Sequence, residues 1–351
     1  MSRFYTLTVK AIERITPQSV TVSFHIPESL NKTFLFSAGQ YITIKKELNG
    51  TEVRRSYSVC TAPKSGALKI GIKKVPHGLF SSFVNDELKE GDTLDVHPPE
   101  GRFVFLPEKD KARQIMALAA GSGITPVMSI MKTALEEEPD SAVVLVYGNK
   151  NVTETMFHRE ILHLKAQYPQ RFFVYPVYSV SREEGALFGR IDRSVVSYVL
   201  KNTHKTRHFD AFYLCGPEAM ITHVTEVLQE QNIEKERIFF ELFTSASETA
   251  QKTPRNTEGQ TRVTMVLDNV ETTFVMDKKQ CILDAALKEG LDAPYSCQGG
   301  VCSSCVARLK EGEAPMEQNH ILTDSDVEEG FTLTCQAYPK TETLFVDYDD
   351  V

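Results

Sequence analysis

Four cysteines near the carboxyl terminus constrain this chain more than any other feature of its sequence. Cys297, Cys302, Cys305 and Cys335 follow the spacing C-x4-C-x2-C with a distant fourth cysteine. This is the ligand pattern of a plant-type 2Fe–2S cluster, which is held by four cysteine thiolates. The sequence therefore predicts an iron–sulfur domain at this end of the chain and a protein that transfers electrons.

The loop that carries the first three cysteines also contains Gly299 and Gly300. Glycine adopts backbone conformations that other residues avoid, so we expect both glycines to let the loop curl around the cluster. A structural zinc site is the alternative interpretation of these cysteines. Four-cysteine zinc sites usually consist of two C-x2-C pairs, and this chain has only one such pair, which favours the cluster.

Length and composition are those of an ordinary globular protein of two or three domains, with 351 residues, 41% hydrophobic and 25% charged. No segment approaches the ~18 apolar residues that a membrane span needs, and the amino terminus has no signal-peptide core. Three scattered cysteines, Cys60, Cys215 and Cys281, remain outside the cluster, which suits a reducing compartment. We therefore expect a cytoplasmic protein without a membrane partner.

Charge is spread unevenly along the chain. Residues 261–351 contain 17 Asp and Glu against 7 Lys and Arg, a net charge of −10, while the whole chain carries −8. This asymmetry argues against nucleic-acid binding and predicts an acidic face that could attract a basic partner protein. The alternative is that the acidic residues serve solubility alone.

The pattern of apolar residues changes twice along the chain. Up to about residue 105, short alternating segments separated by Gly, Pro, Asn and Asp predict an antiparallel β-barrel. From about residue 112, buried-strand segments alternate with helical segments, which predicts a parallel sheet covered on both faces. Residues 244–261 are polar and predict a linker, and two strands and a helix near Ile282 precede the cysteines.

A motif in the first segment resembles the flavin motif of the ferredoxin–NADP reductase family. It reads Arg55-Ser56-Tyr57-Ser58. In that family the tyrosine packs on the isoalloxazine ring, the serine hydroxyl contacts the ring and the arginine pairs with a flavin phosphate. An aromatic wall and a charge-assisted phosphate contact suit a planar, phosphorylated cofactor.

The resemblance extends further along the barrel and implies FAD. A G-x-x-S turn there opens a short helix whose backbone N–H groups hold the pyrophosphate in the family. The residues that match these flavin-binding positions are Ile72, Lys73, Gly78, Leu79, Phe80, Ser81 and Ser82. Phthalate dioxygenase reductase shares the order of domains but uses FMN, so FMN remains the alternative flavin.

A glycine-rich segment of the second domain predicts a nicotinamide nucleotide site. Gly121 and Gly123 follow a buried strand and precede a helix, where glycine permits close approach to a pyrophosphate. Ile124 and Thr125 complete the predicted loop, and Pro126 replaces the last glycine of G-x-G-x-x-G. The reductase family has this form with proline, so the departure supports the resemblance.

The family's nicotinamide also faces a C-G-P segment. Cys215, Gly216 and Pro217 match it, with Met220 close by; a purely structural buried cysteine is the alternative. Glu241 matches an acidic position on the family's last strand, near the flavin. The resemblance thus implies four candidate catalytic residues: Tyr57, Ser58, Cys215 and Glu241.

The choice between NADPH and NADH depends on residues after the third strand of the second domain. Ser181 and Arg182 offer a hydroxyl and a guanidinium for the 2′-phosphate of NADPH. Glu183 and Glu184 follow directly, and an acidic residue near such a place favours the 2′-hydroxyl of NADH. We expect NADPH, with NADH as the alternative.

The motifs occur in the order of the class IA oxygenase reductases. The resemblance implies a multidomain fold: a flavin-binding β-barrel (1–107), an α/β nucleotide-binding domain (108–243), a linker (244–261) and a β-grasp ferredoxin domain of the α+β class (262–351). It implies electron transfer from NADPH through FAD and the cluster to an oxygenase component of the phenylacetyl-CoA epoxidase type. The alternatives are a stand-alone reductase of a ferredoxin, haem protein or other acceptor, and a non-enzymatic redox sensor.

Overall fold

The computed structural model describes residues 4–243 and 259–351. One compact unit contains residues 5–53 and 57–243, and the second consists mainly of residues from 259 onward. The predicted linker at 244–261 lies outside the described residues apart from its last three positions. There the first strand of the second unit already begins at Gln260. Within the described residues, no helix is both long and apolar enough to cross a membrane.

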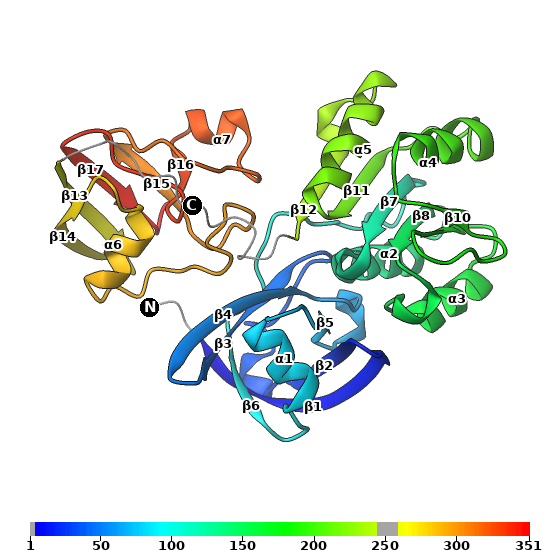
Figure 1. The fold of residues 1–351 in the computed structure, drawn as a ribbon, viewed down its shortest axis with the longest axis horizontal. Helices are drawn as coiled ribbons and strands as arrows, with labels where there is room; N and C mark the ends of the chain where they lie inside the picture. Colours follow the sequence, from blue (N-terminus) through cyan, green and yellow to red (C-terminus); the bar gives the residue numbers. More distant parts are fainter. Residues whose placement is uncertain (1–3, 244–258) are drawn as a thin grey trace. The chain divides into compact units, whose positions relative to one another are not determined.

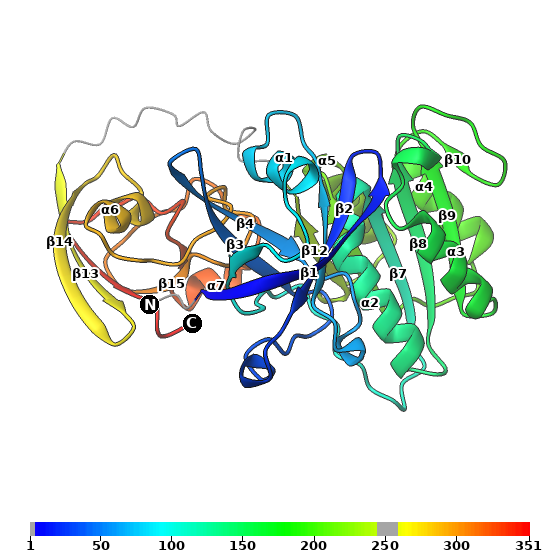
Figure 2. The same cartoon turned by 90° about the horizontal axis from the view of Figure 1, so that it is seen from below.

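Six strands form the antiparallel sheet of the first unit (Figure 1). They are β1 (Tyr5–Thr16), β2 (Ser19–His25), β3 (Tyr41–Leu48), β4 (Thr51–Ser58), β5 (Lys69–Lys73) and β6 (Thr93–Val96), in the order β4-β3-β6-β1-β2-β5. Alternate residues of β1, such as Leu7 and Val9, point into a core that is closed to solvent. Helix α1 (Leu79–Asp86) packs against β5 and β2. Figure 2 shows the same unit seen from below. The short 3₁₀ turns η1 (Glu28–Leu30) and η2 (Pro63–Ser65) lie in the loops.

A parallel sheet follows in the same unit, with the order β10-β9-β8-β7-β11-β12. Its strands are β7 (Gln114–Ala120), β8 (Ala142–Asn149), β9 (Phe172–Tyr178), β10 (Leu187–Phe188), β11 (Ala211–Gly216) and β12 (Ile238–Leu242). The chain builds outward from β7 to β10 on one side and then returns to add β11 and β12 on the other. The order therefore reverses between β7 and β11, and the carboxyl ends of these two strands are where open α/β sheets bind ligands.

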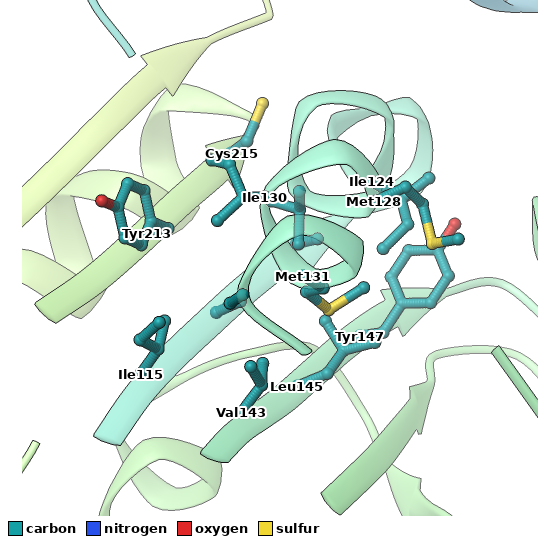
Figure 3. Packing of buried hydrophobic residues seen from close by; sticks show 14 of the residues in the cluster. Ile115, Ile124, Met128, Ile130, Met131, Val143, Leu145, Tyr147, Tyr213 and Cys215 are labelled. Carbon is teal, nitrogen blue, oxygen red and sulfur yellow. The ribbon is translucent and has the colours of Figure 1, made fainter. Parts of the chain in front are cut away.

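Helices cover both faces of this sheet (Figure 1). Helices α2 (Ile124–Glu137) and α3 (His158–Gln167) lie on one face, and α4 (Arg193–Ser197) and α5 (Glu218–Glu230) on the other. The connections include the 3₁₀ turns η3 (Gly121–Gly123), η4 (Val152–Glu154) and η6 (Lys235–Arg237). Figure 3 shows the apolar face of α2 against the strands, with Ile124, Met128 and Met131 near Val143, Leu145 and Tyr147 of β8.

Helix α4 changes type in its second half. After Ser197 it passes into the π-helix η5 (Tyr198–Thr203). The N–H of His204 reaches back five residues to the carbonyl of Val199, at 3.0 Å. The wider turn leaves the His204 ring at 2.9 Å from the Tyr175 hydroxyl, so a side-chain contact on β9 accompanies the change of helix type.

The second unit contains a mixed sheet of five strands in the order β14-β13-β17-β15-β16. They are β13 (Gln260–Leu267), β14 (Val270–Asp277), β15 (Val306–Glu311), β16 (Phe331–Leu333) and β17 (Thr343–Asp347), with helices α6 (Ile282–Lys288) and α7 (Asp324–Glu328). Asp268 and Asn269 both have positive φ angles, 55° and 59°, which a tight two-residue hairpin requires. Strand β13 pairs in parallel with β17, and α6 packs into the core, as expected for a β-grasp domain.

Candidate functional site

The glycine turn at the end of β7 uses its two predicted glycines differently. Gly121 has a φ of +55°, and a Cβ atom there would meet nothing within 4 Å. A Cβ atom on Gly123 would lie 2.2 Å from the carbonyl oxygen of Cys215 on β11. Gly121 thus leaves open space at the turn, whereas Gly123 allows the start of α2 to pack directly against the end of β11.

Helix α2 begins without a side-chain hydrogen bond at its N-cap. The first N–H groups of a helix have no partner within the helix, so this end suits an anion such as a pyrophosphate. Ile124, Thr125 and Pro126 are all buried, and the Thr125 hydroxyl donates to the Ser122 carbonyl at 3.0 Å. Their side chains therefore cannot reach a nucleotide. Of the backbone groups, the Ile124 N–H already donates to the Gly121 and Ser122 carbonyls, and Pro126 has no N–H.

The C-G-P segment lies beside this turn, at the end of β11. A Cβ atom on Gly216 would lie 2.9 Å from the Met220 methyl group and 3.1 Å from the Cβ atom of Ala120. Cys215 has no exposed surface, and burial raises the pKa of its thiol well above the usual range. The thiol is therefore protonated at neutral pH and is not a thiolate nucleophile. Pro217 is the N-cap of α5.

Cys215 and Glu241 lie opposite each other on the paired strands β11 and β12. The Ser58 hydroxyl of β4 donates to a carboxylate oxygen of Glu241 at 3.1 Å, so one hydrogen bond connects the barrel to the parallel sheet. Glu241 keeps some accessible surface, but its carboxyl group is enclosed by protein. Burial raises its pKa to about 8, against the opposing effect of the Ser58 hydrogen bond. Three of the four predicted catalytic residues are thus brought together, and the carboxyl group is mostly neutral at pH 7.

Tyr57, the fourth, directly precedes Ser58 on β4 and is half-buried. Its ring stacks on Phe80, with centroids 5.7 Å apart and an interplanar angle of 30°. Phe80 is 1% exposed and belongs to the barrel core. Phe80 can therefore contribute to flavin binding only through its backbone or by supporting Tyr57.

The G-x-x-S turn at the start of α1 is held by its own residues. The Ser81 hydroxyl accepts from the Val75 N–H at 3.2 Å and donates to the Gly78 carbonyl at 3.3 Å. A Cβ atom on Gly78 would lie 2.4 Å from the Ser81 hydroxyl. Gly78 is also the N-cap and supplies no side-chain hydrogen bond, so the first turn of α1 offers N–H groups to a phosphate.

The other predicted flavin residues differ in exposure. Ile72 has no exposed surface and points into the barrel core. Lys73 lies 3.6 Å from the Glu154 carboxylate, so its charge is already paired. Arg55 and Leu79 are exposed, and Ser82 is partly buried. Of this group, Arg55 is the residue whose charge is exposed for contact with a phosphate.

Ser181 and Arg182 follow β9 near the same edge of the sheet. The Ser181 N–H donates to the Lys150 carbonyl at 3.4 Å, and its hydroxyl is buried without a hydrogen-bond partner among the described residues. The Arg182 guanidinium lies over the Phe188 ring of β10, 4.5 Å from its centroid. The sequence interpretation missed this aromatic support, because β10 has only two residues and gives no strand pattern.

The cluster cysteines all belong to the second unit, and their thiols converge. Hydrogen bonds with Cys302 and then Cys335 lower the pKa of Cys297, and those with Cys297 and Cys305 raise the pKa of Cys335. Each thiol is thus linked to at least one other. Within the described ranges, no group of three or more His, Cys, Asp or Glu side chains is arranged to hold a metal ion. A 2Fe–2S cluster distributes its four thiolates over two iron atoms, which the paired contacts fit.

The loop around these cysteines corrects one expectation. Gly300 has a φ of +72°, and a Cβ atom there would lie 2.7 Å from the Gln318 carbonyl oxygen. The second left-handed residue of the loop is Gln298, with a φ of 53°, and not Gly299. The Gln336 side chain donates to the Gln298 carbonyl at 2.9 Å, which helps to hold a conformation that glutamine rarely adopts.

A cavity of about 310 Å³ lies elsewhere, at the edge of the parallel sheet where β11 begins. Leu200, Lys201, Lys205, Arg207, His208, Phe209, Phe212, Gln231 and Ile233 line it. None of the predicted site residues is among them. It is therefore separate from the glycine turn, which lies at the carboxyl ends of the strands.

Three family models match the chain in sequence. They are the oxidoreductase FAD-binding domain over residues 6–105, the oxidoreductase NAD-binding domain over 117–226 and the 2Fe-2S iron-sulfur cluster binding domain over 265–340. The matched ranges include the site residues described above, except Glu241 on β12. The chain therefore binds FAD, a nicotinamide nucleotide and a 2Fe–2S cluster.

Two curated proteins are similar over nearly their whole length. One of the subunits of 1,2-phenylacetyl-CoA epoxidase from Escherichia coli is 33% identical over 351 residues, covering 99% of both chains. The ferredoxin reductase component of 3-ketosteroid-9-alpha-monooxygenase from Rhodococcus rhodochrous is 32% identical, covering 99% of this chain and 97% of that one.

Among solved structures, phthalate dioxygenase reductase shares the fold over 98% of both chains, with a TM-score of 0.60 and 23% identity. An intact type IV self-sufficient cytochrome P450 monooxygenase matches 98% of this chain and 41% of its own, with a TM-score of 0.70 and 21% identity. The chain therefore belongs to the ferredoxin–NADP reductase-like oxygenase reductases, NAD(P)H oxidoreductases that combine an FAD-binding, an NAD-binding and a carboxyl-terminal 2Fe–2S domain.

Proposed function

We propose that this protein oxidises NADPH and delivers the electrons, through FAD and the 2Fe–2S cluster, to an oxygenase component of the phenylacetyl-CoA epoxidase type. The full-length similarity to a protein of the Escherichia coli epoxidase carries the proposal. Other similar proteins are named as reductase components of 3-ketosteroid and glycine betaine monooxygenases. This supports an oxygenase partner in preference to a redox sensor or a stand-alone reductase.

We propose that the protein is cytoplasmic, because Cys60, Cys215 and Cys281 are buried free thiols. The proposed domain boundary at 107/108 falls between the residues matched by the FAD-binding and NAD-binding models. The proposed start of the ferredoxin domain moves from 262 to 260, where β13 begins.

When bound, FAD accepts two electrons together as hydride from the nicotinamide and releases them one at a time. In our proposal, the chain orients the two cofactors for this exchange. Tyr57, supported by Phe80, packs against the flavin ring, and Ser58 is held by its hydrogen bond to Glu241. The neutral thiol of Cys215 and the neutral carboxyl of Glu241 keep the hydride path free of negative charge.

We expect the stability of the first unit to fall with rising pH because of Glu241. Its pKa is about 8 in the folded protein, above the usual 4.5, so the folded state binds more protons between these values. The stabilisation is complete below about pH 4.5 and is lost as the pH rises to about 8, by at most ~1.4 kcal/mol per pH unit. Thermal unfolding from pH 5 to 8.5 should show a falling Tm for the wild type and a flatter profile for Glu241→Gln.

Ser58→Ala serves as the companion to this measurement. The Ser58 hydrogen bond favours the charged carboxylate, so its removal should raise the folded pKa further and extend the decline to higher pH, while the decline still begins near the unfolded pKa. Parallel Tm profiles for the wild type and Glu241→Gln would show that Glu241 does not titrate in this range.

We assign the flavin pyrophosphate to the first turn of α1 and to Arg55, and the nicotinamide pyrophosphate to the first turn of α2. Both helices begin at a glycine without a side-chain cap, so their N–H groups face no competing oxygen from the N-cap residue. Ser181 and Arg182 then recognise the 2′-phosphate of NADPH. The stacking of Arg182 on Phe188 restricts the guanidinium before the nucleotide binds.

Arg182→Ala is expected to raise the KM for NADPH at least about tenfold and to leave the KM for NADH nearly unchanged. A hydrogen bond to a charged group contributes about 1.5–3 kcal/mol, and only NADPH carries the phosphate that would make it. Steady-state ferricyanide reduction with each nucleotide measures both values. Arg159→Ala, which removes an exposed arginine of α3, is the control, and an unchanged NADPH/NADH ratio in Arg182→Ala would reject the assignment.

We propose that the oxygenase component binds the acidic surface formed by the exposed residues Asp324, Glu328 and Glu329 at α7. Asp326 is excluded, because its carboxylate accepts from the N–H and hydroxyl of Thr323 in a capping box. Exposed charges attract over about 8 Å at physiological salt, so they should mainly accelerate association. The electron-transfer rate to the oxygenase component should therefore fall as ionic strength rises.

The measurement is NADPH-driven reduction of the purified oxygenase component between low and high salt, with reduction of the flavin as internal reference. Glu328→Lys/Glu329→Lys should slow the transfer at low salt and weaken its salt dependence. Glu271→Lys/Glu342→Lys changes the net charge equally at other exposed positions of the same unit. If both double variants behave alike, α7 is not the docking surface; if no electrons reach the oxygenase component at all, the proposed function itself is wrong.

A further inference from the structure

The side-chain amide of Asn149, the last residue of β8, makes no well-formed hydrogen bond within the part of the chain that the structure describes. Its amide nitrogen and its amide oxygen are both buried. Buried polar groups of native proteins are nearly always hydrogen-bonded, because an unmade bond destabilises the fold. An amide with both ends unsatisfied therefore indicates that something outside the chain supplies its partners.

Asn149 lies between the two ends of the nucleotide site. Two positions earlier on β8, the Tyr147 hydroxyl donates to the carbonyl of Gly121 in the glycine turn, at 2.9 Å. The Asn149 amide lies beside this phenol, and a weak hydrogen-bonding interaction between the two side chains opposes the rise that burial causes in the pKa of Tyr147. This contact is too poor to satisfy the amide. On the other side, the Ser179 N–H donates to the Asn149 carbonyl at 3.0 Å.

The next residues continue toward the predicted 2′-phosphate site. The N–H groups of Val180 and Ser181 donate to the Lys150 carbonyl at 3.0 and 3.4 Å. The Ser181 hydroxyl is the second buried polar group here without a partner in the described chain. Two unsatisfied groups thus lie on adjacent strand ends, at the carboxyl edge of the sheet where such folds bind their ligands.

We infer that the Asn149 amide binds the adenosine moiety of the nicotinamide nucleotide, between the pyrophosphate at the glycine turn and the 2′-substituent at Ser181 and Arg182. An amide presents two donors and one acceptor, which match the donors and acceptors of adenine and of the ribose hydroxyls. This inference rests on the proposed nicotinamide nucleotide site. It assigns to Asn149 a contact that NADH and NADPH share, whereas Arg182 distinguishes them.

The test is equilibrium binding to the protein loaded with FAD and cluster. ADP-ribose and 2′-phospho-ADP-ribose carry the adenosine half of each nucleotide but no nicotinamide, so binding is measured by calorimetry without turnover. Asn149→Leu should weaken both ligands by the same factor, about tenfold, as expected for the loss of a hydrogen-bonding side chain. Arg182→Ala should weaken 2′-phospho-ADP-ribose alone.

Thermal stability distinguishes a nucleotide-binding role of Asn149 from a structural role. In the nucleotide-free protein the described residues offer the Asn149 amide only the weak contact with Tyr147. Asn149→Leu should therefore change the Tm little and should reduce the rise in Tm that either ligand causes. Asn149→Asp, which keeps the shape but replaces the donors with an acceptor, should weaken both ligands as well. Thr225→Val removes another buried, unpartnered hydroxyl, on α5, and should leave binding unchanged.

Wild-type affinity in both Asn149 variants would overturn the inference and leave the nucleotide site standing. So would a lower Tm of nucleotide-free Asn149→Leu together with normal binding by Asn149→Asp, or a loss confined to 2′-phospho-ADP-ribose. Failure of the wild-type protein to bind either ligand would overturn the nucleotide site together with the inference.

Discussion

Replacing Cys302 by serine is expected to abolish electron transfer to large acceptors such as cytochrome c. The Cys302 thiol is one of the four linked thiols, through its hydrogen bond with Cys297. A 2Fe–2S cluster needs all four thiolates, and a serine hydroxyl is a far weaker ligand for iron at neutral pH. Ferricyanide is small and can be reduced directly by the flavin, so NADPH–ferricyanide activity should remain largely intact.

Cys281 provides a matched control within the same unit. It is buried, is not one of the predicted ligands, and its sulfur accepts the Asp284 N–H at 3.4 Å as the N-cap of α6. Serine is a preferred N-cap residue, so Cys281→Ser should fold and keep both activities. Iron and sulfide content, flavin content and the two activities are measured side by side. Equal loss of both activities in Cys302→Ser, or loss of iron in Cys281→Ser, would contradict the assignment.

Gly123→Ala is expected to have the second large effect. A Cβ atom at this position would lie 2.2 Å from the Cys215 carbonyl oxygen and 2.9 Å from the Gly216 nitrogen, which are backbone atoms. Neither can move aside alone, so the start of α2 and the end of β11 must separate. A misplacement of about 1 Å in an active site can cost ~100-fold in rate, and we expect a loss of this size in kcat/KM for NADPH.

Gly121→Ala tests whether this loss comes from the contact or from the turn in general. A Cβ atom on Gly121 meets nothing within 4 Å, and only the φ of +55° opposes the substitution, at roughly 1–2 kcal/mol. Anaerobic stopped-flow reduction of the flavin by NADPH measures both variants, with FAD content and Tm to show that they are folded. A smaller effect of Gly123→Ala than of Gly121→Ala would refute the packing argument.

The sequence alone determined the features that short motifs encode. The spacing of the four cysteines predicts the cluster ligands because they lie close together in the chain, except for Cys335. The G-x-G-x-x-P and G-x-x-S segments predict turns that open helices, and α2 and α1 begin there. The patterns of apolar residues predict the antiparallel sheet, the parallel sheet and the first two strands of the second unit, because period-two and helical patterns are written in consecutive residues. The rest of the β-grasp sheet is implied only by the family resemblance.

The tertiary structure decided the features that depend on residues far apart in the chain. Ser58 and Glu241 are separated by 183 positions, and their hydrogen bond and the raised pKa of Glu241 arise only when two sheets enclose the carboxyl group. Gly123 must be glycine because of the Cys215 carbonyl on another strand. Phe80 and Ile72 match a flavin motif, but their side chains pack into the barrel core. Lys73 matches it as well, but its ammonium group is paired with the Glu154 carboxylate.

Asn149 illustrates most plainly the difference between what the sequence determines and what the folded chain determines. Its position at the end of a buried strand follows from the sequence pattern, but asparagine at a strand end is common in turns and carries no signal by itself. That both ends of its amide are buried and unsatisfied depends on how β7, β8 and β9 and their loops close around it. Motifs identify residues through local spacing, whereas burial and unmet hydrogen bonds are properties of the surroundings that only the folded chain supplies.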